Sequence, residues 1–289
     1  MILFHDPSCV EYGSPLRPEQ PARITGSVAH LKPAHPDWAW RKAGMATEAS
    51  LLTAHTPALL KRLQHAPDID DDTPWFPEIY AHARRSVGAA LAAADAARAG
   101  EQAFSVMRPP GHHCTRTQAM GFCYLNQIAI AALHVLQHGL RVAVWDFDAH
   151  HGNGTEDILA GRPNVLFVSV HQSPGYPGTG TRSTANCKNF PVAPHAPRST
   201  HRETLAKSWE TVIEFKPDLV LVSAGFDAYA GDPITQMTLE RDDFAELGRW
   251  IRESSLPAAA MLEGGYGSDL PLLIDDFLSA WEKTTPLSA

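Results

Sequence analysis

Five apolar runs spaced along the chain constrain its fold more than any other feature. They are too continuously apolar for half-exposed strands, which is typical of strands buried on both faces of a parallel sheet. Helical patterns lie between them. This alternation predicts one α/β domain over residues 1–289, with a central, mostly parallel sheet flanked by helices. The predicted strands are residues 103–107, 142–145, 165–170, 219–222 and 258–262, and the predicted helices are residues 80–99, 126–137, 202–215 and 242–253.

One long segment, residues 174–200, lacks a sustained pattern. It is rich in Pro, Gly, Ser and Thr, and is interrupted by the strand-like residues 189–192. A linker between two domains would have this composition. Because the segment directly follows a predicted strand that ends in His171, we expect a long functional loop within a single domain instead.

The composition excludes several classes of protein. Lys and Arg total 24 against 32 Asp and Glu, a net charge of -8, which argues against binding nucleic acid through its phosphates. No apolar run approaches the roughly 20 residues of a membrane helix, so we expect a cytoplasmic protein without a membrane partner. The four cysteines are scattered and are expected to be free thiols. Whether the chain forms a homo-oligomer is left open.

Polar side chains follow each of the five predicted strands. In open parallel sheets, ligands bind outside the carboxyl ends of the strands, so we expect these residues to line one cleft. Ordinary turn chemistry would explain one or two such sets, but not five. The sets are residues 108–113, residues 146–151, His171, Asp227 and residues 263–266.

A metal site is the simplest explanation of Asp146, Asp148 and His150. Their spacing puts the three side chains on one face of an extended chain, and two adjacent carboxylates repel unless a cation lies between them. Asp227 would add a further ligand, although a lone Asp is more often a cap or turn residue. A purely structural role for the triplet also stays open. The Irving–Williams order favours Zn²⁺, and the oxygen-rich set leaves Fe²⁺, Co²⁺ and Mn²⁺ open.

A histidine pair and a tyrosine suggest what such a metal would work with. His112 and His113 follow a rigid Pro-Pro-Gly turn and could hold a water between a metal and a base, although most such pairs have no role. Tyr266 stands in a glycine-rich loop, where its hydroxyl could donate to an oxyanion. The other histidines are expected at the surface, among them His30, His35, His55, His65, His82, His134, His138, His195 and His201.

The motifs together resemble the histone deacetylase superfamily, which shares its fold with arginases. The resemblance runs in family order from roughly residue 5 to the last helix and implies an arginase/deacetylase-like fold with its active site at the carboxyl ends of the strands. It implies a zinc-dependent hydrolase that deacetylates a lysine-like side chain or a small N-acyl amine. The matching segments are residues 108–113, 121–126, 146–154, 169–180, 224–227 and 263–266.

The resemblance also assigns roles to single residues. It implies that Asp148, His150 and Asp227 hold zinc, that His112 and His113 flank the attacking water, and that Tyr266 polarises the amide carbonyl. In the resemblance, Asp146 is not a zinc ligand. It would instead hydrogen-bond to His112 and help to bind a structural K⁺ ion. The K⁺ site would lie at Asp146, Asp148, His150, Ser169 and Val170.

Asn153 stands where class I members carry Asp, and we expect it behind His113. This asparagine and residues 17–23 resemble the class II-like bacterial branch, the histone deacetylase-like amidohydrolases. General base catalysis is assigned to His113, while His112 acts as an electrostatic partner.

Substrate contacts are implied at the cleft rim. Phe122, beside Gly121, and Tyr176 would form the aromatic walls of an acyl-lysine tunnel. Family members specific for polyamines carry an acidic residue where this chain has Ile234, and an apolar side chain cannot pair with a remote ammonium. The acidic run Asp68, Asp70, Asp71 and Asp72 reads as a solvated loop, from which one member, expected to be Asp72, could bind substrate amides.

Three other functions stay open at this stage. The chain could be an acetylpolyamine amidohydrolase, a dimanganese ureohydrolase of the arginase kind, or a non-catalytic module that binds acyl-lysine. The ureohydrolase is disfavoured because Tyr266 and the histidine pair would have no function in it. The binding module is disfavoured because it would not need a complete set of metal ligands. The expected partner is therefore an acetylated lysine peptide or protein, or a small acylated amine.

Overall fold

The central sheet has eight strands in the described part of the chain. The fold is that of a computed structural model, which describes residues 1–65 and 69–282. Every pair of neighbouring strands is parallel, and the order is β2-β1-β3-β8-β7-β4-β5-β6. The strands are β1 (Ile2–Phe4), β2 (Ala39–Arg41), β3 (Ala103–Ser105), β4 (Val142–Asp146), β5 (Val165–Gln172), β6 (Cys187–Val192), β7 (Leu219–Ala224) and β8 (Ala258–Leu262).

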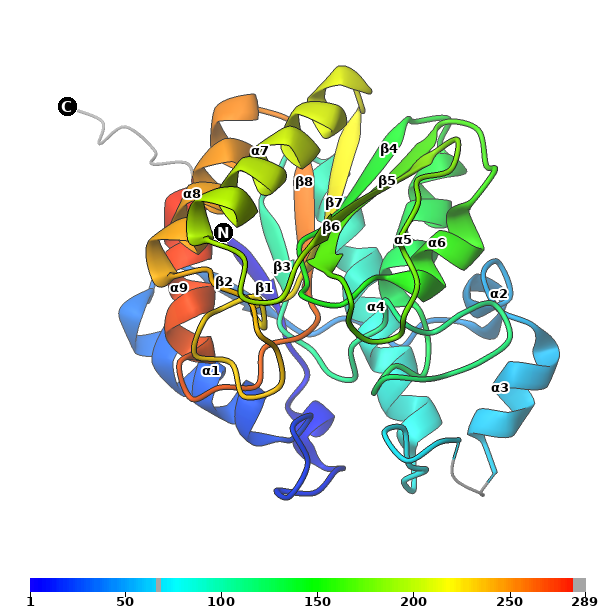
Figure 1. The fold of residues 1–289 in the computed structure, drawn as a ribbon. Coiled ribbons are helices and arrows are strands. Elements are labelled where there is room, and N and C mark those ends of the chain that lie inside the picture. Colours follow the sequence, from blue (N-terminus) through cyan, green and yellow to red (C-terminus); the bar gives the residue numbers. More distant parts are fainter. Residues whose placement is uncertain (66–68, 283–289) are drawn as a thin grey trace.

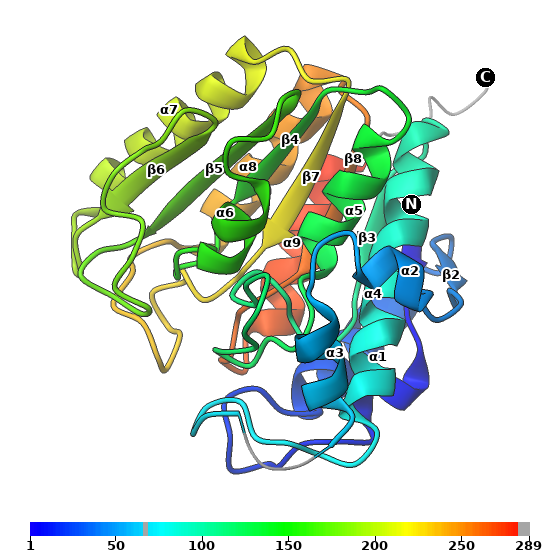
Figure 2. The same ribbon diagram turned by 90° about the vertical axis from the view of Figure 1, so that its right-hand side faces the viewer.

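Helices cover both faces of the sheet, which gives three layers (Figures 1 and 2). The helices α4, α5 and α6 pack on one face, and α1, α7, α8 and α9 form the layer on the other. The helices are α1 (Ala22–Ala34), α2 (Glu48–Leu51), α3 (Pro57–Leu63), α4 (Ile79–Arg98), α5 (Gln127–Leu136), α6 (Asn153–Leu159), α7 (Arg198–Glu214), α8 (Arg241–Ser254) and α9 (Leu270–Trp281), with a short 3₁₀ turn at Pro7–Val10.

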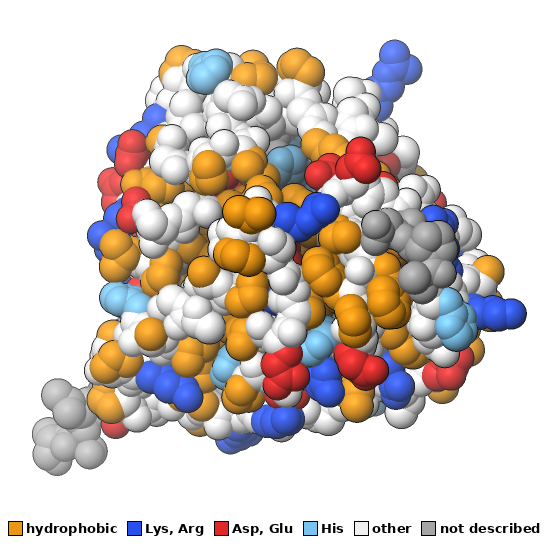
Figure 3. Space-filling view, turned by 90° about the horizontal axis from the view of Figure 1, so that it is seen from below, with side chains coloured by type: hydrophobic (Ala, Val, Ile, Leu, Met, Phe, Trp, Pro, Cys, Tyr) orange, Lys and Arg blue, Asp and Glu red, His pale blue; other side chains and the backbone are white. Residues whose placement is uncertain are grey.

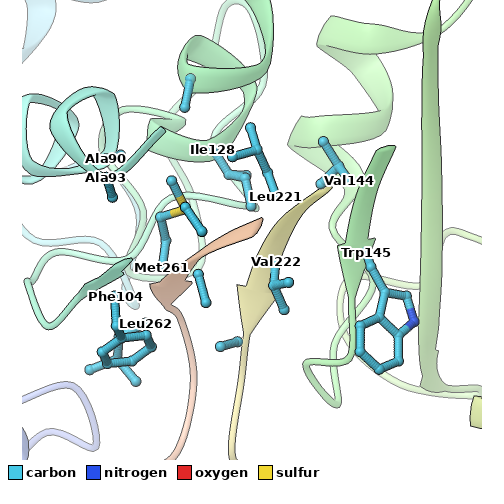
Figure 4. Close-up of a cluster of buried hydrophobic side chains, with 14 of the residues drawn as sticks. Ala90, Ala93, Phe104, Ile128, Val144, Trp145, Leu221, Val222, Met261 and Leu262 are labelled. Carbon is cyan, nitrogen blue, oxygen red and sulfur yellow. The ribbon is translucent and has the colours of Figure 1, made fainter. Parts of the chain in front are cut away.

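The middle strands are apolar because both of their faces are covered. All residues of β4, β7 and β8 are buried. Small alanines such as Ala90 and Ala93 let α4 approach β3 and β8 closely, and Ile128 of α5 packs beside Leu221 of β7 in the same cluster (Figure 4). The sheet is thereby held rigid, and its carboxyl edge becomes a fixed platform for side chains.

The predicted α/β class with a parallel sheet is confirmed. The five predicted strands and four predicted helices all form, with ends shifted by at most a few residues. Two strands were not predicted, and a third, β6, was anticipated only as the strand-like residues 189–192. β1 and β2 have only three residues each, and β6 lies at the edge of the sheet, where Pro191 and the partly exposed Lys188 interrupt its apolar pattern.

Two expectations need correction. Residues 174–200 are not one long loop, because 187–192 form β6 and α7 already begins at Arg198. Three histidines expected at the surface are buried, namely His55, His82 and His201. His55 is satisfied inside, since it contacts the Thr115 carbonyl through Nδ1 (3.0 Å) and accepts from the Asn126 N–H through Nε2 (2.9 Å).

The structure agrees with the expected free cysteines, and nothing in it conflicts with the expected absence of a membrane helix. Cys9, Cys114, Cys123 and Cys187 are free and buried. Among the residues that the structure describes, no helix is both long enough and apolar enough to cross a membrane.

Candidate active site

Two carboxylates and an imidazole converge below the carboxyl ends of β4 and β7. Asp148 and His150 follow β4, Asp227 follows β7, and one ligand atom from each lies within 4.8 Å of the other two. Nδ1 of His150 is 2.9 Å from Oδ2 of Asp227 and 3.2 Å from Oδ1 of Asp148. Backbone amides fix the carboxylates, because Gly264 N–H donates to Asp148 (2.7 Å) and Ala149 N–H donates to Asp227 (2.8 Å).

This group is electrostatically incomplete without a cation. Asp148 and Asp227 are fully buried, and among the described residues neither pairs with a Lys or Arg side chain. Burial and the charge of Asp148 raise the pKa of Asp227 to about 7. Burial alone would also raise the pKa of Asp148, but the charge of His112 and hydrogen bonds from His150 hold it below its usual value. A divalent ion would offset this concentrated negative charge.

A glycine makes room for the ligands. A Cβ placed on Gly264 would lie 2.2 Å from Oδ2 of Asp227 and 2.6 Å from Oδ2 of Asp148. Any larger residue would collide with both carboxylates. The glycine pair before Tyr266 therefore serves close backbone approach to the ligand set.

His112 and His113 lie beside the ligands, each with a different partner. Nδ1 of His112 donates to Oδ2 of Asp146 (3.0 Å), whereas Nδ1 of His113 donates to the side-chain oxygen of Asn153 (2.8 Å). The predicted pairings of Asp146 with His112 and of Asn153 with His113 therefore match the geometry. With its Nδ1 hydrogen donated, His113 keeps Nε2 as an acceptor.

His112 and His113 have very different pKa values, because their surroundings differ. Burial opposes charge on His112, but the carboxylates of Asp148 and Asp146 outweigh it and raise the pKa of His112 to about 10. For His113, burial and the positive charges of His112 and His150 act together and hold its pKa well below the usual value. His113 is thus the member that stays neutral near pH 7.

Tyr266 completes the group from the loop after β8. Its N–H donates to Oδ2 of Asp232 (2.8 Å), the guanidinium of Arg23 lies 4.9 Å from the centre of its ring, and Phe122 packs against it. Arg23 is itself fixed by the carbonyls of Gly265 and Glu263. Burial raises the pKa of the Tyr266 hydroxyl well above its usual value, so it remains a proton donor.

A cavity of about 270 Å³ joins these side chains to the surface. His113, His150 and Tyr266 line it together with all five predicted substrate-contact residues, which are Gly121, Phe122, Tyr176, Ile234 and Asp72. Pro18 completes the lining. Figure 3 views the molecule from below, the side on which the loops after the strands lie, and hydrophobic side chains with interspersed charged and histidine side chains cover that face. Asp68, the first member of the predicted acidic run, lies outside the described residues.

Gly121 and Phe122 form a sharp bend in the cavity wall. Both have positive φ, 56° and 68°. A Cβ on Gly121 would lie 2.6 Å from the His113 ring, so only glycine fits there. The Phe122 N–H donates to the buried hydroxyl of Thr73 (3.2 Å), which ties the acidic loop carrying Asp72 to the aromatic wall.

His171 is the second-last residue of β5, and it does not line the cavity. Its ring packs on His151 with centroids 4.7 Å apart, and it bonds the Ser169 hydroxyl and the Gly180 carbonyl. Ser169 is the register partner of Asp146 across β4 and β5. Three of the five strand-end sets therefore line the cavity, through His113, His150 and Tyr266. Asp227 joins the site through the ligand group, whereas His171 contacts the loop that follows β5.

Sequence reasoning assigned no role to three further residues. Asp232 accepts from both Tyr266 N–H (2.8 Å) and Ile234 N–H (3.0 Å). Glu263, buried under the histidine pair, accepts from the N–H groups of Gly111 (2.7 Å) and His112 (3.2 Å). Thr73 holds Phe122 as described above. Their only sequence signal was proximity to the motifs, and Glu263 alone stood within one.

Metal-type ligands, a neutral base and a hydroxyl donor in one cavity are what metal-assisted hydrolysis requires. The fold and this site together define a metal-dependent hydrolase whose site lies at the carboxyl edge of a parallel sheet. Comparison with known proteins narrows that class.

The model of the histone deacetylase domain matches residues 17–274. A probable deacetylase of Methanothermobacter thermautotrophicus is 34% identical over 283 residues, which cover 92% of this chain and 86% of the relative. A histone deacetylase-like amidohydrolase of Pseudomonas aeruginosa is 38% identical over 78% of this chain and 66% of its own. A solved acetylpolyamine aminohydrolase from Burkholderia pseudomallei superimposes with a TM-score of 0.89 at 26% identity, covering 97% of this chain and 98% of that one.

The chain therefore belongs to the histone deacetylase family. The predicted resemblance, the fold and the class of enzyme, a deacetylase or amidohydrolase that acts on amide bonds, are confirmed at this level. Metal dependence is general in the family and agrees with the ligand group at Asp148, His150 and Asp227.

Proposed function

We propose that the protein is a zinc-dependent deacetylase that hydrolyses the amide of an N-acetylated lysine-like side chain or a small N-acyl amine. The observation that carries this proposal is one cavity lined by His150 of the ligand group, by His113 and by Tyr266. The single sheet of the described residues supports one catalytic domain over residues 1–289.

The donor set fits zinc. Asp148, His150 and Asp227 would hold the ion, as three-ligand catalytic sites do, with a position left for water or substrate. Fe²⁺ or Co²⁺ would suit the same two oxygens and one nitrogen. The bound ion would supply Lewis acidity towards the substrate carbonyl and the attacking water.

His113 is assigned as general base. Its Nε2 would take a proton from the attacking water and later return it to the leaving amine, while Asn153 holds the ring through Nδ1 (2.8 Å). His112, paired with Asp146 at 3.0 Å, would remain cationic and orient the reacting groups electrostatically. The hydroxyl of Tyr266 would donate to the developing oxyanion.

A second cation, K⁺, is proposed beneath the site. Asp146 is fully buried next to Asp148, and burial raises the pKa of Asp146. A monovalent ion near Asp146, Asp148, His150, Ser169 and Val170 would stabilise both carboxylates in the charged form. The register of Asp146 with Ser169 supports the proximity of these residues.

The cavity favours a thin, extended substrate. Phe122 and Tyr176 would enclose an alkyl stem, and Asp72 at the rim would accept hydrogen bonds from substrate amides. Ile234 lines the same cavity and offers no charge to a distal ammonium. We therefore place acetyl-lysine ahead of acetylated polyamines, which remain the second candidate because of the Burkholderia pseudomallei neighbour.

Metal analysis combined with three turnover assays tests this function. One preparation is given an acetyl-lysine peptide, an acetylated polyamine and arginine, each with and without chelator. Chelator-sensitive release of acetate from the peptide or polyamine supports the deacetylase. Binding of the peptide without acetate release would indicate a non-catalytic module, and urea release would indicate the two-metal ureohydrolase.

Replacing Asn153 with Asp tests His113 as base. A carboxylate beside Nδ1 stabilises the imidazolium and raises the pKa of His113, so the protonated, inactive form persists to higher pH. The acidic limb of the kcat/KM profile is therefore expected to move to higher pH. The limb belongs to His113, His112 and the water as a coupled group.

The measurement is a pH-rate profile of Asn153→Asp and wild type at matched metal content. Asn164→Asp makes the same chemical change at an exposed loop residue and should leave the limb in place. A limb that stays put or moves downward in Asn153→Asp would contradict the pairing or the role of His113.

Replacing Ile234 with Glu tests the cavity rim. A carboxylate there would meet the remote ammonium of a polyamine, and we expect kcat/KM for acetylated polyamine over acetyl-lysine peptide to rise roughly fivefold, as an ion pair of about 1 kcal/mol gives. Ile234→Gln has a similar shape without charge and should leave the ratio near that of wild type. An unchanged ratio in the Glu variant would remove Ile234 from the specificity determinants.

A further inference from the structure

A second group of metal-type ligands lies outside the active site. It consists of Asp95 on α4, His134 in the last turn of α5 and His138 in the turn that follows α5, and one ligand atom from each lies within 4.8 Å of the other two. Nε2 of His134 donates to Oδ1 of Asp95 (2.9 Å). The His134 and His138 rings meet edge to face with centroids 5.2 Å apart.

The group is far from the catalytic cavity in the topology of the fold. Asp95 is in the last turn of α4, which leads into β3. His134 is in the last turn of α5, and His138 is in the turn between α5 and β4. Both helices therefore end at the amino edge of the sheet, opposite the edge that carries Asp148 and Asp227. The two helices pack against each other (Figure 2), so Asp95 and His134 are presented by a rigid pair of helices, and His138 follows directly after the second one.

The two histidines are close enough to bind one ion together. His134 is in the last turn of α5, and the turn that follows the helix places the His138 ring beside the His134 ring. Asp95 adds a carboxylate from the neighbouring helix, which makes a set of two histidines and one carboxylate. Three such ligands and water form a common zinc site, with ligand atoms roughly 3.4 Å apart in a tetrahedron. Small rotations of exposed side chains would bring the three atoms to that separation.

The side chains of this second ligand group are exposed enough for an ion to reach them from solvent. The Asp95 and His134 side chains are 51% and 29% exposed, and His134 also lines a surface hollow of about 200 Å³ beside α2. Arg98 is the one competitor seen among the described contacts, since its Nη1 donates to Oδ1 of Asp95 (2.8 Å).

We propose that Asp95, His134 and His138 form a second, non-catalytic site for a divalent transition metal such as Zn²⁺, which fastens the end of α4 to the end of α5. This site shares no residue with the catalytic cavity and does not depend on the catalytic ion. Because the ligands are half exposed, the ion would exchange with solvent more readily than the catalytic ion.

The test is zinc uptake by the enzyme already loaded with its catalytic ion. Equilibrium dialysis against Zn²⁺ should show one further equivalent per wild-type chain. His138→Ala and Asp95→Asn should each lower the affinity of this equivalent by about tenfold or more, while retaining the first equivalent and full amide hydrolysis. His65→Ala removes an exposed histidine elsewhere and should keep both equivalents.

A second measurement distinguishes specific zinc binding at this site from non-specific binding elsewhere on the surface. Zn²⁺ should raise the melting temperature of loaded wild type but not of loaded His138→Ala, and Arg98→Ala should bind the further equivalent more tightly because the competing cation is gone. Uptake that is unchanged in both His138→Ala and Asp95→Asn would overturn the site, as would the absence of a further equivalent in wild type.

Discussion

Replacing any one of Asp148, His150 and Asp227 with alanine is expected to remove the bound metal and lower kcat/KM by about two orders of magnitude or more. A site with three protein ligands loses most of its affinity when one is deleted, since even the loss of an outer partner costs about 10- to 100-fold. The measurement is metal content by elemental analysis beside turnover of an acetyl-lysine peptide. Full zinc occupancy in one of the three variants would remove that residue from the ligand set.

His150→Ala is the cleanest of the three variants. Asp148 and Asp227 also accept backbone hydrogen bonds from Gly264 and Ala149, so their deletion leaves buried amides unsatisfied and lowers stability as well. The side chain of His150 is 14% exposed. In the described part of the chain, its ring has the two carboxylates as its only partners at hydrogen-bond distance. Asp37→Ala, a change at an exposed carboxylate, is the control and should keep both metal and activity.

Stability of the metal-free protein gives an independent check on the ligand group. Because the folded-state pKa of Asp227 is raised from 3.8 to about 7, the folded chain binds this proton more tightly than the unfolded chain. Unfolding free energy of the apo protein should therefore fall as pH rises from about 4 to about 7. In apo Asp227→Asn this loss should be smaller than in wild type, even though the variant binds little zinc.

The sheet was largely predictable, and what was missed has identifiable causes. Strands buried on both faces must be apolar throughout, which is why the five runs from 103 to 262 were visible. β1 and β2 are too short to show a pattern. β6 pairs with β5 alone among the described strands, and its free side tolerates Pro191, so only residues 189–192 looked strand-like. The burial of His55 depends on partners 60 and 71 residues away.

Site residues that lie in short sequence motifs were predictable. Site residues that act by accepting hydrogen bonds from distant backbone N–H groups were not. Asp148, His150 and the histidine pair lie in short motifs whose spacing carries information. Asp232 and Glu263 act by accepting from N–H groups 34 and 152 residues away. A backbone N–H exists at every residue except proline, so no residue type marks such a contact in the sequence.

Tyr266→Phe is expected to lower kcat by about 10²- to 10³-fold while leaving KM and metal content near their wild-type values. Loss of one oxyanion donor has this magnitude in other hydrolases. The ring is held by contacts that do not involve its hydroxyl: the Asp232 bond to the Tyr266 N–H, the Arg23 guanidinium 4.9 Å from the ring centre, and the packing of Phe122. Phenylalanine should therefore occupy the same place, and the variant removes only the donor.

Tyr176→Phe is the matched control, because it deletes a hydroxyl from the other tyrosine that lines the cavity. Tyr176 is proposed to contact the substrate stem with its ring, so this variant should change kcat little. Steady-state kinetics of both variants at matched zinc content separate the two roles: an effect on kcat alone in Tyr266→Phe places its hydroxyl in the transition state. A rise confined to KM in Tyr266→Phe, or an equal loss of kcat in Tyr176→Phe, would mean that the hydroxyl of Tyr266 is not the donor and that the oxyanion is stabilised elsewhere in the cavity.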